Sequence, residues 1–222
     1  VFCITLSKTI MKVFALLGLL ALASVVQGGK YGYDLSTYCD ENTCLKQNGY
    51  SFAIPRCWQS NGRLDPNCKS NINNAKTAGL NPVDGYMFPC VPCGNPTQQM
   101  DDLIADLGGI ANRIWIDVEV YEWSSSLSSN QNFITSLIQA GKAKGVKMGI
   151  YSSYYNWQSI VGLSWSYPSQ QGLPLWYAHY DNNPSFSDYV EFGGWSTPTI
   201  KQYVGDATEC STGIDKNWSP SY

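Results

Sequence analysis

Residues 113–120 carry two acidic side chains, Asp117 and Glu119, only two positions apart. The segment is rich in β-branched and aromatic residues, and its apolar positions alternate, so it predicts a β-strand. Both acids then share one face with Trp115. The other face carries Ile114, Ile116, Val118 and Val120. Two carboxyl groups on one rigid face raise each other's pKa, and burial raises both. Such a pair suits acid/base catalysis, in which one carboxyl group holds a proton while another stays charged.

Seven further segments predict strands, and helical patterns separate the earlier ones. The seven segments are 31–35, 51–58, 82–89, 146–152, 173–181, 199–204 and 213–218. We expect a helix from Pro66 to Ala78 with Asp65 as its N-cap, and a second helix opened by Asn95-Pro96 with Gln98 in a capping box. A third helix is expected to start at Asn130, and a short one covers 157–161. Helical patterns fade beyond this point.

Alternating strands and helices predict a parallel sheet, and eight such strands predict a closed barrel. We therefore expect an α/β fold, a single modified (β/α)8-like barrel with short or missing helices in its C-terminal half. Active sites of these barrels form at the carboxyl ends of the strands. Five acids fall at or near these ends, namely Asp34, Asp117, Glu119, Asp181 and Asp215. Tyr86, Tyr151, Trp176 and Gln202 occupy equivalent positions and can supply hydrogen bonds.

We expect the first 28 residues to lie outside the folded domain. Met11-Lys12 followed by the apolar run 13–26 has the pattern of a secretory signal peptide, and residues 1–10 read as an upstream extension. We expect cleavage after Gly28, with Ala23 as the alternative, and a catalytic barrel over 29–222. The protein is then secreted, either to the outside or into a digestive, lysosome-like compartment.

The charge balance argues against nucleic acid and anionic lipid as main partners. Lys8 and Lys12 would leave with the leader, so the net charge would change from −3 to −5. Eight Trp and 15 Tyr are many for 222 residues and suit stacking on sugar rings as well as filling a core. We expect a monomer that needs no metal or other cofactor and does not enter a membrane.

Seven cysteines would remain after cleavage, and disulfides are the default in a secreted protein. The simplest pairing joins neighbours in sequence: Cys39 with Cys44, Cys57 with Cys68, and Cys90 with Cys93. Cys210 is then the free thiol. Asn217-Trp218-Ser219 matches the N-glycosylation pattern, but its closeness to Asp215 predicts that it stays unmodified.

The order and spacing of several short motifs resemble glycoside hydrolase family 25, the CH-type lysozymes, and in particular their secreted animal branch. The motifs are YGYDLS at 31–36, GYMFP at 85–89, WIDVE at 115–119, GIYSS at 149–153, LWYAHYD at 175–181, KQY at 201–203 and GIDKNW at 213–218. Lys201 stands where many members have Trp. The resemblance covers nearly the whole mature chain.

This resemblance implies a modified β/α barrel with N-acetylmuramidase activity, which cleaves the β-1,4 bond between N-acetylmuramic acid and N-acetylglucosamine in bacterial peptidoglycan. It implies Glu119 as proton donor, Asp117 as an orienting or charge-stabilising residue, and catalytic contributions from Asp34 and Asp215. Asp181 and the four hydrogen-bonding residues named above would bind substrate. The biological role would be peptidoglycan breakdown in defence or digestion.

Two other readings compete with this one. A chitinase-like hydrolase usually carries a longer run of alternating acids on the key strand, whereas Asn112 and Ile114 stand at those positions here. A secreted glycan-binding barrel without catalysis would keep the aromatic residues but has no need for Glu119. A Ser-His-Asp hydrolase is disfavoured because His179 is the sole histidine and the chain has no G-x-S-x-G motif.

Overall fold

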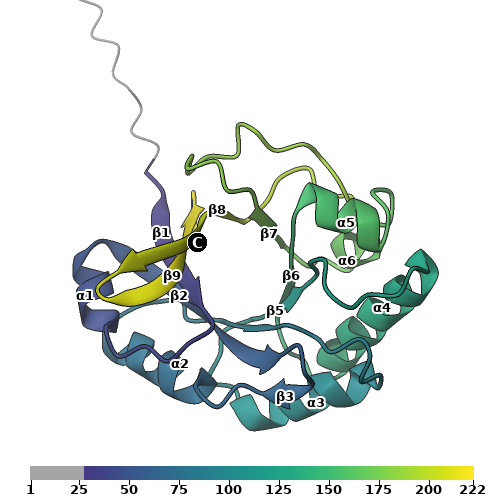
Figure 1. The fold of residues 1–222 in the computed structure, drawn as a ribbon, viewed down its shortest axis with the longest axis horizontal. Helices are drawn as coiled ribbons and strands as arrows, with labels where there is room; N and C mark the ends of the chain where they lie inside the picture. The colour runs from purple at the N-terminus through teal and green to yellow at the C-terminus, as the bar shows by residue number, and fades with distance from the viewer. Residues whose placement is uncertain (1–27) are drawn as a thin grey trace, which may run out of the picture.

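A computed structural model describes residues 28–222, in which eight strands form a closed barrel (Figure 1). The ring closes because β1 (Lys30–Leu35) pairs with β2 (Tyr50–Gln59) on one side and β9 (Thr212–Ser219) on the other. The remaining ring strands are β4 (Gly85–Met87), β5 (Ile114–Asp117), β6 (Met148–Ser152), β7 (Leu175–Ala178) and β8 (Ile200–Glu209). A short strand, β3 (Arg63–Leu64), pairs with β2 outside the ring. The expected barrel is confirmed.

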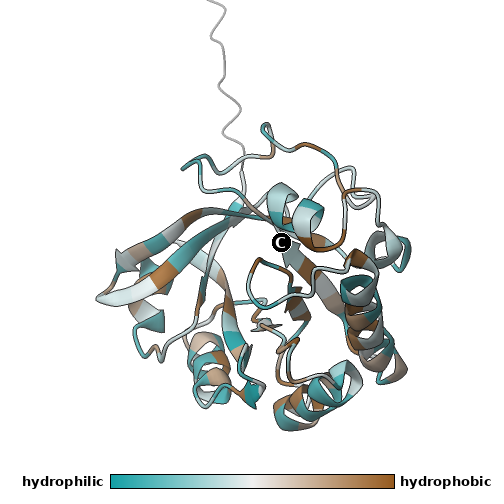
Figure 2. Cartoon of the chain, turned by 45° about the vertical axis from the view of Figure 1, so that its right-hand side comes forward, coloured by the Kyte–Doolittle hydropathy of each residue, from teal (hydrophilic) through white to brown (hydrophobic). Residues whose placement is uncertain are grey.

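The helices thin out toward the C-terminus, as the sequence predicts. Three of them contain ten or more residues: α2 (Cys68–Thr77), α3 (Pro96–Leu107) and α4 (Leu127–Ala143). The others are α1 (Asn42–Gln47), α5 (Tyr154–Ile160) and α6 (Tyr167–Gln170). Within residues 28–222, no helix lies between β7 and β8 or between β8 and β9. Figure 2 shows brown hydrophobic and teal hydrophilic residues alternating along the helices, which is typical of helices with one buried face.

The last strand runs against the expected direction, because β9 is antiparallel to both of its neighbours. β8 and β9 form a hairpin whose two connecting residues, Cys210 and Ser211, have φ values of 51° and 61°. Positive φ at both positions is the geometry of a tight hairpin turn whose twist matches the strands. The fully parallel barrel expected from the sequence is therefore wrong at this strand.

Two apolar layers hold the barrel. The side chains of Ile114, Ile116 and Val118 belong to the outer layer beneath the helices, as predicted. The inner layer fills the barrel with Phe52, Ile54, Trp115, Tyr151, Trp176, Ala178 and Ile200. Strand β5 ends at Asp117, earlier than expected, so Glu119 lies in the following loop. Val120 is 64% exposed, and its predicted place in the core is wrong.

The start of α3 at Asn95-Pro96 is confirmed, whereas the starts of α2 and α4 and the capping box of α3 differ from the predictions. α2 begins at Cys68, and Asp65 precedes it by a turn, although Asp65 Oδ1 still accepts from the Asn67 amide at 2.9 Å. Gln98 does not cap α3, because its amide donates to Asp102 one turn later. α4 begins three residues before Asn130 with Ser126 as its N-cap.

The disulfides differ from the expected pairing in one place. Cys57–Cys68 and Cys90–Cys93 are present as predicted. Cys44 instead pairs with Cys210, 166 positions away, and buried Cys39 is the free thiol among the described residues. Figure 1 shows why: the β8–β9 hairpin (yellow) extends outward to α1, which carries Cys44.

The predicted upstream extension and signal peptide fall on residues that lie almost entirely outside the described part of the chain. Over residues 28–222, none of the helices combines the length and apolar character that crossing a membrane requires.

Candidate active site

Strands on opposite sides of the barrel bring four acids to one mouth. Asp34 lies near the end of β1, and Asp117 ends β5, with Glu119 two residues later. Asp215 stands opposite Asp34 in the register of β1 and β9. Because β9 is antiparallel, a residue in its first half reaches the edge where the parallel strands end. The prediction that Asp215 joins the other acids is met, but by a strand of the opposite direction.

These four acids line one small pocket of about 90 Å³ together with most of the expected polar residues. The other lining residues are Tyr86, Tyr151, Trp176, Tyr180 and Gln202. A wider cleft of about 310 Å³ adjoins it and shares Asp34, Tyr86 and Asp215. The cleft continues along β1 and the β8–β9 hairpin, with Ser36, Thr37, Asp206 and Thr208 among its lining residues. The small acidic pocket therefore lies beside a larger cleft with many polar lining residues.

Asp34 and Asp215 receive several hydrogen bonds. Gln202 Nε2 lies 2.9 Å from Asp34 Oδ2 and 3.1 Å from Asp215 Oδ2. Asn217 Nδ2 also donates to Asp34 Oδ2 at 2.6 Å, and the Asp206 amide donates to Asp215 Oδ1 at 2.7 Å. Burial and the charge of Asp215 raise the pKa of Asp34, whereas the two amide donors oppose that rise. Burial likewise raises the pKa of Asp215.

Asp117 and Glu119 have a different environment. Asp117 is 4% exposed, and its Oδ1 is buried without a hydrogen-bond partner in the described chain. Burial, followed by Glu119 and Asp34, raises the pKa of Asp117 well above its usual range. Burial and Asp215 raise the pKa of half-buried Glu119. The predicted repulsion between Asp117 and Glu119 is present, and Asp215 adds a second, unpredicted repulsion on Glu119.

The loop after β5 holds Glu119 in place although the strand has ended. Trp123 Nε1 donates to the Glu119 carbonyl oxygen at 2.7 Å. On either side, Ser152 Oγ donates to the Val118 carbonyl oxygen at 2.7 Å, and the Val120 amide donates to Asn156 Oδ1 at 3.3 Å. The backbone on both sides of Glu119 is therefore anchored, which favours a fixed position for its carboxyl group.

The aromatic residues form the wall and floor of the pocket. Trp176 is 2% exposed and meets Tyr151 and Tyr86 edge to face at 4.6 Å and 6.2 Å between ring centroids. Its Nε1 donates to Asn217 Oδ1 at 2.7 Å. Tyr180 also lines the pocket, although it was not predicted. The motif LWYAHYD drew attention to the next residue, Asp181, instead. Asn217 was also missed as a site residue, and its complete burial fits the expectation that it is not glycosylated.

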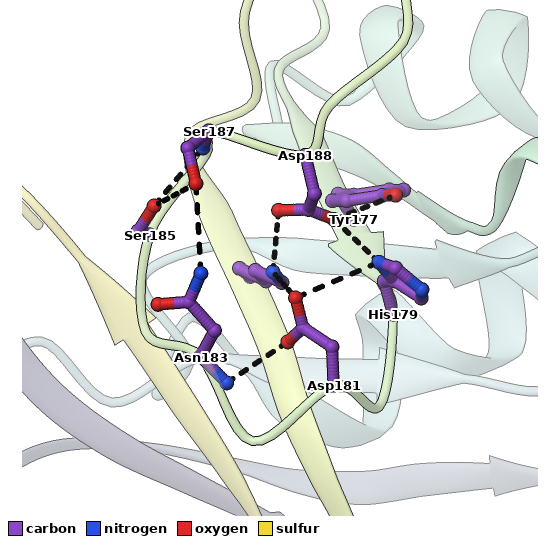
Figure 3. Close-up of polar contacts among 8 residues, drawn as sticks. Tyr177, His179, Asp181, Asn183, Ser185, Ser187 and Asp188 are labelled. Carbon is purple, nitrogen blue, oxygen red and sulfur yellow. Dashed lines mark hydrogen bonds and ion pairs between the residues drawn. The ribbon is translucent and has the colours of Figure 1, made fainter.

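Asp181 is the one predicted site acid that lies apart from this pocket. It belongs to a cluster with His179, Asp188 and Lys201 beside β7 (Figure 3). Lys201 Nζ lies 2.8 Å from Asp181 Oδ2 and 2.6 Å from Asp188 Oδ1, and its side chain is fully buried. His179 Nδ1 is hydrogen-bonded to Asp188, and Tyr177 donates to the same carboxylate. Lys201 thus forms the buried centre of an ion cluster whose acids are partly exposed.

This cluster is also where the described residues come nearest to a metal site. Ligand atoms of His179, Asp181 and Asp188 lie within 4.8 Å of one another. The Lys201 ammonium group already balances both carboxylates, so a cation there would have to compete with a buried charge of the same sign. We therefore assign these residues a structural role.

A barrel with several carboxyl groups at the carboxyl ends of its strands, opening into a polar cleft, has the features of a glycoside hydrolase. The two acids of differing environment, Asp117 and Glu119, are the kind of pair that protonates a leaving oxygen. Comparison with known proteins identifies the family.

A family model described as lysozyme-like protein 1 matches residues 26–203. A probable glycoside hydrolase family 25 lysozyme from Dictyostelium discoideum is 44% identical over 194 residues, covering 85% of this chain and 90% of that protein. Lysozyme-like protein 5 from Caenorhabditis elegans is 40% identical over 210 residues, covering 91% of this chain and 97% of that protein. The chain therefore belongs to the glycoside hydrolase family 25 lysozymes.

Solved structures agree on the fold. A family 25 lysozyme from Aspergillus fumigatus superposes with a TM-score of 0.72 at 20% identity, covering 86% of this chain and 94% of that one. A muramidase from Acremonium alcalophilum gives a TM-score of 0.70 at the same identity. Family membership makes the chain a glycoside hydrolase of the lysozyme, or muramidase, type.

Proposed function

We propose that the chain hydrolyses the β-1,4 bond between N-acetylmuramic acid and N-acetylglucosamine in peptidoglycan, with Glu119 as the proton donor. The observation that carries this proposal is the convergence of four carboxyl groups on one pocket, where Glu119 is the half-buried member with a raised pKa. A raised pKa keeps the proton on Glu119 at mildly acidic pH, where it is needed for transfer to the leaving oxygen.

The other acids have complementary roles in the proposed reaction. When Glu119 protonates the glycosidic oxygen, the bond from C1 to that oxygen breaks and positive charge develops at C1. Asp34 and Asp215 lie on the other side of the pocket and would stabilise this charge as carboxylates. Asp117 lies next to Glu119 on the β5 side, where its contribution is to orient the reacting groups. Tyr86, Tyr151 and Tyr180 supply hydroxyl groups for the sugar.

The natural substrate and location are proposals of the same kind. One structural relative, the autolysin LytC from Streptococcus pneumoniae, has been solved in complex with a synthetic peptidoglycan ligand. Its likeness to this chain supports the shared fold, and the polar cleft described above gives room for adjoining sugar residues. Three disulfides are consistent with an oxidising compartment. We propose a secreted monomer whose acidic composition suits digestion in an acidic compartment better than capture of anionic cell walls.

Replacing Glu119 tests the assignment most sharply when the leaving group is varied. Glu119→Gln should lower kcat on peptidoglycan roughly 10²- to 10⁴-fold, the usual contribution of general acid catalysis. The loss should be much smaller on a dinitrophenyl glycoside, because that leaving group departs without a proton. Exposed Glu122, three positions away, gives the matched control Glu122→Gln, which should keep wild-type kcat. Equal losses on both substrates would show that Glu119 has another role.

A further inference from the structure

Gln202 lies at the centre of the acid cluster and uses every hydrogen bond that its side chain can make. A carboxamide offers two N–H donors and an oxygen with two lone pairs. Nε2 donates to Asp34 and Asp215, as described above, and Oε1 accepts from Tyr151 at 2.6 Å and from Tyr180 at 2.9 Å. The side chain is 2% exposed. A sugar hydroxyl could bind Gln202 only by displacing one of these bonds, so its expected role as a substrate contact does not fit.

The surroundings fix the orientation of this amide. A flipped Gln202 would point its oxygen at two carboxylates and its amino group at two tyrosine hydroxyls. The opposite orientation therefore replaces two attractive contacts by two repulsive ones. Asn217 is fixed in the same way, because Trp176 Nε1 donates to its oxygen and leaves its amino group facing Asp34. Both amides thus present N–H groups to the acids.

These donors are distributed unevenly among the acids. Asp34 Oδ2 accepts from two amides, and Asp215 has one donor on each oxygen. Buried Asp117 has an oxygen with no partner at all in the described chain. Hydrogen bonds donated to a carboxyl group favour its charged form, whereas burial without donors favours the neutral form. Burial raises the pKa of both Asp34 and Asp117, but only Asp34 has amide donors that oppose this rise and favour its charged form.

We propose that Gln202 is a positioning residue that holds Asp34 and Asp215 as a pair of carboxylates and leaves Asp117 as the buried acid that binds a proton. This inference rests on the proposed function, because it explains how a site with four acids keeps negative charge on one side and protons on the other. A charged Asp215 would also help to keep Glu119 protonated, in line with the raised pKa of Glu119.

Other titratable groups around the pair are held by separate elements. They are Arg56 on β2, Tyr86 on β4, Asp117 and Glu119 at the end of β5, Tyr151 on β6, Tyr180 after β7, and Asp206 on β8. Among these, Arg56 supplies positive charge, and it acts on Asp117 and Tyr86. Among residues 28–222, Gln202 is the only side chain that donates to both Asp34 and Asp215.

Gln202→Met tests the proposal, because methionine has a similar length and cannot donate these bonds. The acidic limb of the kcat profile should move to higher pH by about one unit, the usual effect of losing one hydrogen bond to a carboxylate. The KM for peptidoglycan should stay within about twofold, because Gln202 does not contact substrate. A raised KM with an unchanged pH profile would make Gln202 a sugar ligand and overturn the proposal. Gln131→Met, on α4 away from the pocket, is the matched control and should leave both quantities unchanged.

A second measurement on the unaltered protein keeps the test valid if Gln202→Met fails to fold. Carboxyl ¹³C NMR with labelled aspartate, assigned with Asp34→Asn and Asp117→Asn, should show Asp34 titrating at lower pH than Asp117. The reverse order would overturn the proposal. If Glu119→Gln is fully active, the proposed function itself has failed. If Glu119→Gln is inactive while Asp34 titrates above Asp117, only the assignment of Gln202 has failed.

Discussion

Lys201→Met should destabilise the fold substantially, because it leaves two carboxylates facing each other without their cation. The Lys201 side chain is fully buried, and the side chains of Asp181 and Asp188 are 22% and 20% exposed. Breaking a buried ion pair typically costs 3–5 kcal/mol. Since both acids retain some contact with water, we expect the lower end, about 3 kcal/mol. For a chain of this size, that corresponds to a Tm lower by roughly 6–12 °C.

Thermal unfolding followed by circular dichroism at pH 7 measures this change. Lys69→Met is the matched control, because Lys69 makes a 2.6 Å ion pair with Asp106 while its side chain is 51% exposed. Exposed pairs contribute under about 1 kcal/mol, so the control should change Tm by only a few degrees. Adding Asp181→Asn and Asp188→Asn to Lys201→Met should restore part of the lost stability. If the Tm of that triple variant is no higher than the Tm of Lys201→Met, unbalanced carboxylate charge is not the cause of the destabilisation.

The pH dependence gives an independent check on the same cluster. Burial raises the pKa of Asp188, but hydrogen bonds from Lys201 and His179 outweigh burial and leave it below its usual value. A carboxyl group with a lowered pKa in the folded state stabilises the fold above its unfolded pKa, and this stability is lost as pH falls through the folded value. The Tm difference between wild type and Lys201→Met should therefore be largest near neutrality and shrink below about pH 4.

Further predictions concern the disulfides and the acidic optimum. A double serine variant that lacks the Cys44–Cys210 bond should have a free energy of unfolding lower by up to about 5 kcal/mol, because the bond closes a loop of 166 positions. Urea denaturation measures this change, and a difference below about 1 kcal/mol would contradict the prediction. In a chain starting at Gly29, one thiol should react with Ellman's reagent only after unfolding, and peptide mapping should place this thiol at Cys39. A free thiol at Cys210 would instead support disulfides between cysteines that are neighbours in sequence. Activity should peak at mildly acidic pH and fall as Glu119 loses its proton, and a flat profile up to pH 9 would exclude Glu119 as the donor.

The sequence predicts the barrel and most of its acidic mouth because both depend on short-range patterns. Alternation in β5 gives the two faces correctly, with Trp115 and Asp117 inside and the isoleucines outside. The direction of β9 is missed because its hairpin turn uses Cys210 and Ser211, not the Asn-Gly or Asp-Gly pair that marks such turns. The same turn carries Cys210 to α1, which explains why pairing cysteines by nearness in sequence fails.

The roles of Lys201 and Gln202 could not be predicted because they depend on contacts with residues that are distant in sequence. The charge of Lys201 is balanced by acids 20 and 13 positions away, so its burial has no local signal. Gln202 was placed at the site by its strand position, but its saturation by four partners depends on strands β1, β6 and β9 and on the residues after β7. Whether a polar side chain binds substrate or positions other residues follows from such partners and not from residue type.

The identity of the cleaved bond tests the central claim most directly. Purified peptidoglycan should be digested with the protein, reduced with borohydride, and analysed by mass spectrometry for its new reducing ends. The proposed muramidase reaction predicts muramitol ends, which should disappear with Glu119→Gln and persist with Glu122→Gln. Glucosaminitol ends would show cleavage of the other linkage, and binding without any cleavage would show a glycan-binding barrel; either result would contradict the function proposed for this chain.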